Sequence, residues 1–91
     1  PWLGVLLEPV TREIAEALGL DRISGAVVSR VSNRGPGAGA GLQAGDVITR
    51  IDGFEVTDPR AVYYRLTTRG VGNTARIDLL RNRRPVTIDL A

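Results

Sequence analysis

The chain has 91 residues, enough for one domain, and its 12 basic and 10 acidic residues give a net charge of +2. All the basic residues are arginines scattered along the chain, so the charge does not indicate a nucleic-acid-binding protein. Cysteine and histidine are absent, which excludes disulfides, thiolate metal sites and histidine-based catalysis within the chain, and we expect no cofactor or metal.

The first third of the chain predicts a strand, a short helix and a second strand. Residues 3–8 (LGVLLE) are apolar enough for a strand buried on both faces, and Pro9 ends it. Thr11 is a good N-cap for a helix of about two turns, which Gly19 terminates. Residues 24–31 predict the second strand.

The next segment, residues 32–41 (SNRGPGAGAG), contains four glycines and a proline and is predicted to be a loop. It lacks the spacing of a phosphate-binding loop, so we interpret it as a connector.

Residues 40–53 (AGLQAGDVITRIDG) carry the most regular pattern of the chain. Residues 47–51 predict a strand, and Asp52-Gly53 predicts a tight hairpin turn into the next strand. We interpret Asp46 and Asp52 as turn-forming residues and not as an acid–base pair.

A second helix is predicted from Asp58, a good N-cap, and Pro59, which suits the first helical position. It extends to Thr68, with Val62 and Leu66 facing inward one turn apart.

The last third of the chain predicts a hairpin of two half-buried strands. Residues 73–80 alternate polar and apolar side chains, residues 81–83 turn the chain, and residues 85–90 return. Arg81, Arg83 and Arg84 form the densest basic cluster, which we interpret as a solvated turn. The whole order predicts an α+β domain, with a mainly antiparallel sheet of five to six strands capped by two helices.

A candidate binding site lies at the start of the first strand. A sheet edge beside a helix leaves a groove in which an extended peptide can add as another strand. The successive backbone N–H groups of Leu3, Gly4 and Val5 can converge on an anion, and Gly4 has no Cβ to hold a carboxylate away. Leu3 and Val5 would line a pocket for the last side chain of the peptide.

The chain from Pro1 to Ala91 resembles a PDZ domain of the bacterial HtrA/Deg (DegP-like) serine protease family. Three segments carry the resemblance: PWLGVLLEPVTREIAEALGL, GPGAGAGLQAGDVITRIDG and GNTARIDLLRNRRPVTIDL. The resemblance implies a small curled sheet, or partial barrel, in the circularly permuted bacterial arrangement, with the groove strand first in the chain.

The resemblance also implies where the peptide binds. The carboxylate-binding loop would comprise Trp2, Leu3, Gly4 and Val5. The groove would be lined by Leu6, Leu7, Pro59, Val62, Tyr63, Leu66 and Thr67. Tyr63 is a departure that could narrow the groove or add a hydrogen bond. The alternative interpretation is that Trp2, Leu3 and Val5 are ordinary core or boundary residues and that Tyr63 is a surface aromatic.

The implied function is non-catalytic recognition of C-terminal or unfolded polypeptide segments. The chain starts at Pro1, and we expect it to be one domain, residues 1–91, of a longer exported bacterial protein, periplasmic or envelope-associated, with an N-terminal serine protease domain. PDZ domains of carboxy-terminal processing proteases, site-2 proteases and secretion-system components are similar, and remain alternatives in which the groove docks a partner protein. We expect no nucleic-acid partner, and membrane contact only through the parent protein.

Overall fold

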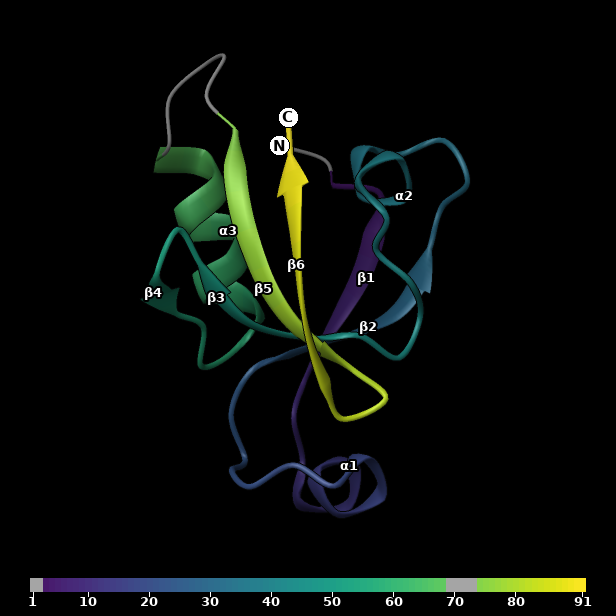
Figure 1. Cartoon of the computed structure of the whole chain (residues 1–91), viewed down its shortest axis with the longest axis vertical. Coiled ribbons are helices and arrows are strands. Elements are labelled where there is room, and N and C mark those ends of the chain that lie inside the picture. The colour runs from purple at the N-terminus through teal and green to yellow at the C-terminus, as the bar shows by residue number, and fades with distance from the viewer. Residues whose placement is uncertain (1–2, 69–73) are drawn as a thin grey trace.

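The computed structural model describes residues 3–68 and 74–91, and their strands form one antiparallel sheet (Figure 1). The sheet order is β1-β2-β3-β5-β6, and β4 pairs with β3 alone. The elements in chain order are β1 (Val5–Pro9), α1 (Arg12–Leu18), β2 (Ala26–Val31), α2 (Pro36–Ala40), β3 (Val47–Ile51), β4 (Phe54–Glu55), α3 (Pro59–Thr68), β5 (Ala75–Arg81) and β6 (Arg84–Leu90). The predicted α+β class is confirmed.

The first strand, β1, lies at one edge of the sheet, where its described partner is β2. Leu7 is buried, whereas Leu6 is 55% exposed and Glu8 is also exposed. The prediction of a strand buried on both faces is therefore wrong: an edge strand with one face on the core leaves its other face in solvent. The strand also extends through Pro9, which was expected to end it.

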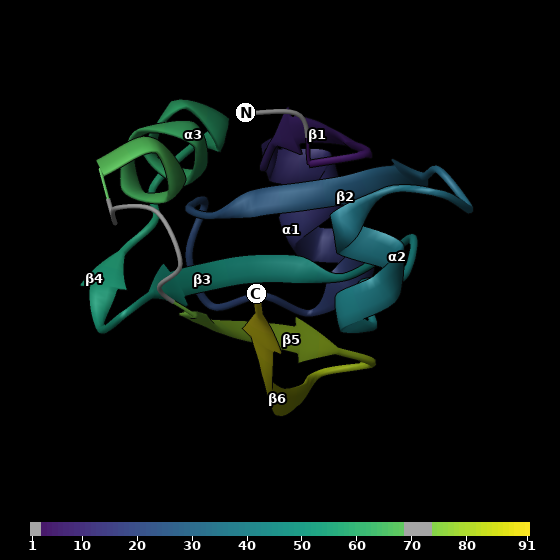
Figure 2. The same ribbon diagram turned by 90° about the horizontal axis from the view of Figure 1, so that it is seen from above.

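The two faces of β2 pack against different helices. Val28 belongs to the main core with Val62 of α3, and Val27 belongs to a small cluster with Ala15 of α1. Because successive strand residues point to opposite faces, α1 and α3 lie on opposite sides of the sheet at β2. Figure 2 shows α3 beside the β1 end of the sheet.

The predicted caps of α1 are confirmed. The Thr11 hydroxyl oxygen accepts a hydrogen bond from the Ile14 N–H at 3.1 Å, and Gly19 closes the helix in the left-handed conformation. These local signals place the helix between the first two strands, as the sequence predicted.

The segment predicted as a loop contains a third helix, α2. Pro36 occupies its first turn, Gly35 is its N-cap, and the N–H of Gly37 donates to the Leu3 carbonyl at 2.9 Å. Proline pre-sets the helical φ at this position, and the contact with Leu3 holds a helix that is too short to be stable alone. The expected count of two helices is therefore wrong.

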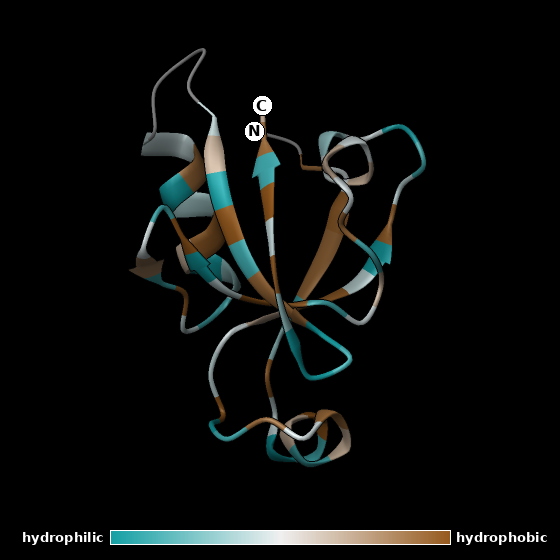
Figure 3. Ribbon diagram, in the orientation of Figure 1, coloured by the Kyte–Doolittle hydropathy of each residue, from teal (hydrophilic) through white to brown (hydrophobic). Residues whose placement is uncertain are grey.

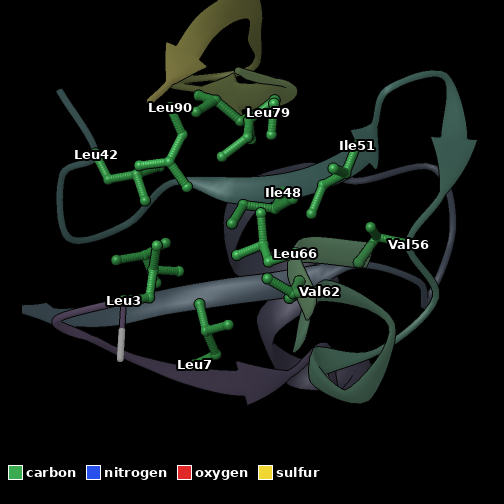
Figure 4. Packing of buried hydrophobic residues seen from close by; sticks show 14 residues of the cluster. Leu3, Leu7, Leu42, Ile48, Ile51, Val56, Val62, Leu66, Leu79 and Leu90 are labelled. Atoms are coloured by element: carbon green, nitrogen blue, oxygen red, sulfur yellow. The ribbon is translucent and has the colours of Figure 1, made fainter. Parts of the chain in front are cut away.

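The main core lies between the sheet and α3. Most of its largest fully buried side chains come from β2, β3, β5 and α3, and Val56 adds one from the segment between β4 and α3. Figure 4 shows Val62 and Leu66 directed toward the same interior as Leu3 and Leu7. Along β5 the polar and apolar residues alternate (Figure 3), with Ile77 and Leu79 buried and Arg76 exposed. This confirms the predicted half-buried strand.

Both predicted hairpin turns are present. Asp52 and Gly53 have φ of 51° and 83°, and Asn82 and Arg83 have φ of 52° and 66°, which suits two-residue turns between twisted strands. Within the part of the chain that the structure describes, we find no helix with the length and apolar character to span a bilayer.

Candidate functional site

The strand β1 directs the backbone groups of Leu7 away from the sheet. Its partner on β2, Val28, bonds in the other direction: the Val28 N–H donates to the Asp46 carbonyl and the Val28 carbonyl accepts from the Gly45 N–H, both at 2.8 Å. Residues opposite each other in a non-hydrogen-bonded antiparallel pair point their backbone groups in opposite directions. The N–H and carbonyl of Leu7 therefore face the outer edge of the sheet.

Val5 has the same orientation. The carbonyls on either side of it point toward β2, since that of Gly4 accepts from the Ser32 N–H at 2.8 Å and that of Leu6 accepts from the Ser29 hydroxyl at 3.2 Å. Backbone groups alternate in direction along a strand, so those of Val5 face outward with those of Leu7.

The loop before β1 is held from inside by the chain around α2. A Cβ built on Gly4, which has a φ of +76°, would lie 2.6 Å from the Cα of Gly35. The missing Cβ of Gly4 therefore makes room for Gly35, and the expectation that it also admits a carboxylate stays a prediction. Leu3 is buried in the core, Val5 is half-buried against it, and Trp2 lies outside the described residues.

The helix α3 contributes two kinds of expected groove residue. Val62 and Leu66 are buried, at 0% and 5% exposure, in the cluster that contains Leu3 and Leu7. Pro59 is half-buried, and Tyr63 and Thr67 are exposed. The buried residues thus join the helix to the core beneath β1, and the exposed ones remain available to a ligand.

The orientation of α3 identifies the side on which Tyr63 lies. The guanidinium carbon of Arg65 is 3.6 Å from the ring centroid of Phe54 in β4, so this flank of the helix faces β4. At 100° per residue, Tyr63 lies on the flank opposite Arg65, together with Pro59 and Thr67. Figure 2 shows α3 between β4 and β1, which places the Tyr63 flank toward β1.

A hollow of about 220 Å³ lies at the start of β1. It is lined by Gly4, Val5 and Leu6 and, from across the pair, by Arg30, Val31 and Ser32. Arg30, an exposed cation beside the expected carboxylate loop, was not predicted from the sequence as a site residue. The sequence signal that could have indicated Arg30 is the polar–apolar alternation of Arg30 and Val31 at the end of β2, which predicts an exposed Arg30 side chain.

The densest basic cluster is not a solvated turn throughout. The Arg81 guanidinium donates from Nε to Asp46 Oδ1 and from Nη2 to Asp46 Oδ2, both at 2.9 Å, and also to the Gly41 carbonyl at 2.9 Å. The hydrogen bond to Asp46 raises the pKa of Arg81 above its ordinary value. Asp46 also accepts from the Gln43 N–H at 2.8 Å, so its predicted turn role is confirmed and extended.

A family model described as "PDZ domain" matches residues 1–91. A probable periplasmic serine endoprotease, DegP-like, of Rhizobium meliloti is 42% identical over 89 residues, which are 98% of this chain and 18% of that protein. The corresponding protein of Halomonas elongata is 38% identical over 81 residues, which are 89% of this chain and 17% of that protein. The chain thus spans less than a fifth of these relatives.

Solved structures with the same architecture include peptide complexes. The HtrA-type protease AlgW with decapeptide has a TM-score of 0.82 and 39% identity, covering 98% of this chain and 27% of that one. The HtrA3 PDZ domain bound to a phage-derived ligand, FGRWV, has a TM-score of 0.83 over 99% of this chain and 82% of that one. At 19% identity, the second likeness concerns the fold alone.

Proposed function

Because this chain belongs to the PDZ domain family and is similar to PDZ domains of DegP-like serine endoproteases, we propose that it binds extended polypeptide segments, above all C-terminal ones, by strand addition. The single observation that carries the proposal is the outward direction of the Val5 and Leu7 backbone groups beside the exposed flank of α3. An extended ligand would pair with these groups while its side chains contact the helix.

The proposed groove has three parts. The carboxylate-binding loop is Trp2, Leu3, Gly4 and Val5; the strand side is Leu6 and Leu7; the helix side is Pro59, Val62, Tyr63, Leu66 and Thr67. The carboxylate would accept from backbone N–H groups at the start of β1, with the exposed Arg30 adding positive charge nearby. Such a site would bind the C-terminal end of a polypeptide without catalysing a reaction on it.

The expected affinity is modest. Four to six backbone hydrogen bonds at roughly 0.5–1.5 kcal/mol each, and one buried side chain at about 1.5–3 kcal/mol, are opposed by the cost of ordering the ligand. We expect dissociation constants on the order of micromolar or weaker. Weak binding suits a domain that holds substrate tails or regulatory segments for the protease domain of an exported, periplasmic parent protein, in keeping with the names of the relatives.

The test is an NMR titration of the isotope-labelled chain with an apolar-ended peptide and with its C-terminally amidated twin. We expect amide shifts at Leu3, Gly4, Val5 and Leu7 with the free carboxylate, and at least tenfold weaker binding of the amide. Identical shifts with both peptides would contradict carboxylate recognition, and the absence of shifts along β1 would contradict strand addition.

A further inference from the structure

The outer edge of β1 changes its hydrogen-bonding character along its length. Val5 and Leu7 each direct an N–H and a carbonyl outward, as their neighbours' bonds to β2 require. The next residue of this parity is Pro9, which is opposite Ala26 in the same register and still belongs to the strand. Proline has no N–H, so the outer edge offers only an acceptor there.

We propose that Pro9 sets the length of peptide that this domain recognises, by ending the hydrogen-bond ladder on the outer edge of β1. The inference rests on the proposed function and adds the extent of the bound segment. Val5 and Leu7 can each donate one hydrogen bond to a bound peptide and accept one from it. Pro9 can accept one but has no N–H to donate.

The register follows from the geometry of antiparallel pairing. If the carboxylate of the last peptide residue accepts from the Val5 N–H, the N–H of that residue donates to the Val5 carbonyl. The third residue from the end then exchanges both bonds with Leu7. The fifth residue from the end faces Pro9, where its N–H finds the Pro9 carbonyl but its own carbonyl finds no donor.

The position of α3 agrees with this limit. Gly25 precedes the residue opposite Pro9, and its N–H donates to the Thr57 carbonyl at 3.1 Å, two residues before α3 begins. The first turn of α3 and the ladder's end at Pro9 therefore lie at the same end of the groove. A bound segment that extends beyond Pro9 therefore loses contact with both β1 and α3 at the same point.

The experiment compares peptides of three, five and seven residues that share the same last three residues and carry an alanine–serine extension. Binding of each to the wild-type chain, to Pro9→Ala and to the matched control Pro85→Ala is measured by calorimetry. Pro85 is exposed in β6, which lies at the opposite end of the strand order from β1. Its replacement therefore also removes a proline but leaves β1 unchanged.

In the wild-type chain and in Pro85→Ala, affinity should rise from three to five residues and then stay level. In Pro9→Ala, the five- and seven-residue peptides should bind about two- to tenfold more tightly than to the wild type, and the three-residue peptide equally. The backbone amide that Pro9→Ala introduces should become protected from hydrogen exchange only with the longer peptides.

A chemical variant of the peptide isolates the same bond. An ester in place of the amide between the fifth and fourth residues from the end weakens the fifth carbonyl as an acceptor. It should lower affinity for Pro9→Ala and leave affinity for the wild type unchanged.

The inference is overturned if wild type and Pro9→Ala depend on peptide length in the same way, or if wild-type affinity rises as much from five to seven residues as from three to five. A failure of the proposed peptide binding itself would give a different result. In that case no peptide of any length would shift the NMR signals of the Val5 and Leu7 amides in the wild-type chain.

Discussion

The loop at Leu3-Gly4 and the turn at Asp46 both close against the sheet, but different chemistry holds them. The turn is closed by a charged pair, in which Arg81 donates twice to a carboxylate that is 1% exposed. The loop has no charged pair: the carbonyls of Leu3 and Gly4 accept backbone hydrogen bonds, two glycines are in contact, and the Leu3 side chain is buried in the core. The charged turn therefore serves stability, and the uncharged loop sets the shape of the proposed site.

The largest expected effect is that of breaking the charged turn. Arg81→Leu leaves the buried Asp46 carboxylate without its cation and should lower the free energy of unfolding by about 3–5 kcal/mol, measured by urea denaturation. Peptide affinity, measured below the unfolding transition, should stay within twofold. Arg84→Leu, at an exposed neighbour, should change stability by less than about 0.5 kcal/mol. Equal losses in the two variants would contradict the assigned role of the pair.

Next in size is the effect of filling the space between the two glycines. Gly35→Ala places a Cβ 2.6 Å from the Cα of Gly4 and 3.1 Å from the Leu3 carbonyl, so backbone must move. We expect a loss of about 1–3 kcal/mol in stability and more than tenfold in peptide affinity.

The matched control for that variant is Gly39→Ala, in the helix α2 that Gly35 caps, where an added Cβ meets nothing within 4 Å. It should preserve binding and leave stability unchanged or slightly raised, because alanine restricts the unfolded chain. Full affinity in Gly35→Ala would show that the loop's shape does not depend on this contact.

A smaller effect concerns the start of α3, the other wall of the proposed groove. Asp58 Oδ1 accepts from the Arg60 N–H at 2.8 Å, so Asp58→Ala removes the cap and should lower the melting temperature by less than Gly35→Ala does.

The same cap predicts a pH dependence. The side-chain hydrogen bond from Arg60 holds the pKa of the Asp58 carboxyl below its ordinary value. A pKa lowered by folding contributes stability above the ordinary value, and this stability is lost as the pH falls through the folded value. The difference in melting temperature between wild type and Asp58→Asn should therefore be largest near neutral pH and shrink in acid. A difference that does not change with pH would contradict a role for the charge.

The smallest effect on stability is expected on the exposed flank of α3. Tyr63→Ala should change the free energy of unfolding by less than about 0.5 kcal/mol. If the Tyr63 flank lines the groove, peptide affinity should fall severalfold, as measured by calorimetry. Tyr64→Ala, 60% exposed and on the helix face away from the core, is the control that should leave affinity unchanged. Equal affinities in the two variants would place Tyr63 outside the groove.

Much of the fold could be predicted because its signals are local. Thr11 and Gly19 cap one helix, Asp52-Gly53 closes a hairpin, and the alternation in β5 marks a half-buried strand. Each signal involves residues within a few positions of one another, where propensity and hydrogen bonding act without the rest of the chain. The short helix α2 was missed because a distant carbonyl, that of Leu3, helps to hold it.

The sequence could predict which two segments of the candidate site come together, but not how their backbone and neighbours are arranged. The start of the first strand and the Val62–Leu66 face of α3 do come together around one core. The packing role of Gly4 depends on its contact with Gly35. The direction of the β1 backbone groups and the position of Arg30 near the start of β1 depend on the pairing of β1 with β2. None of these partners can be identified from the residues around Leu3 alone.

By itself, the sequence determined the order and type of most elements, the caps and turns, and the resemblance to PDZ domains. The tertiary structure alone decided that β1 is an edge strand, that Pro9 continues it, and that Arg81 reaches Asp46 across 35 residues. The physical reason is the range of the interactions. The hydrogen bonds of helix caps and hairpin turns form between residues a few positions apart. Whether a strand has a free edge depends instead on the strand order of the whole sheet.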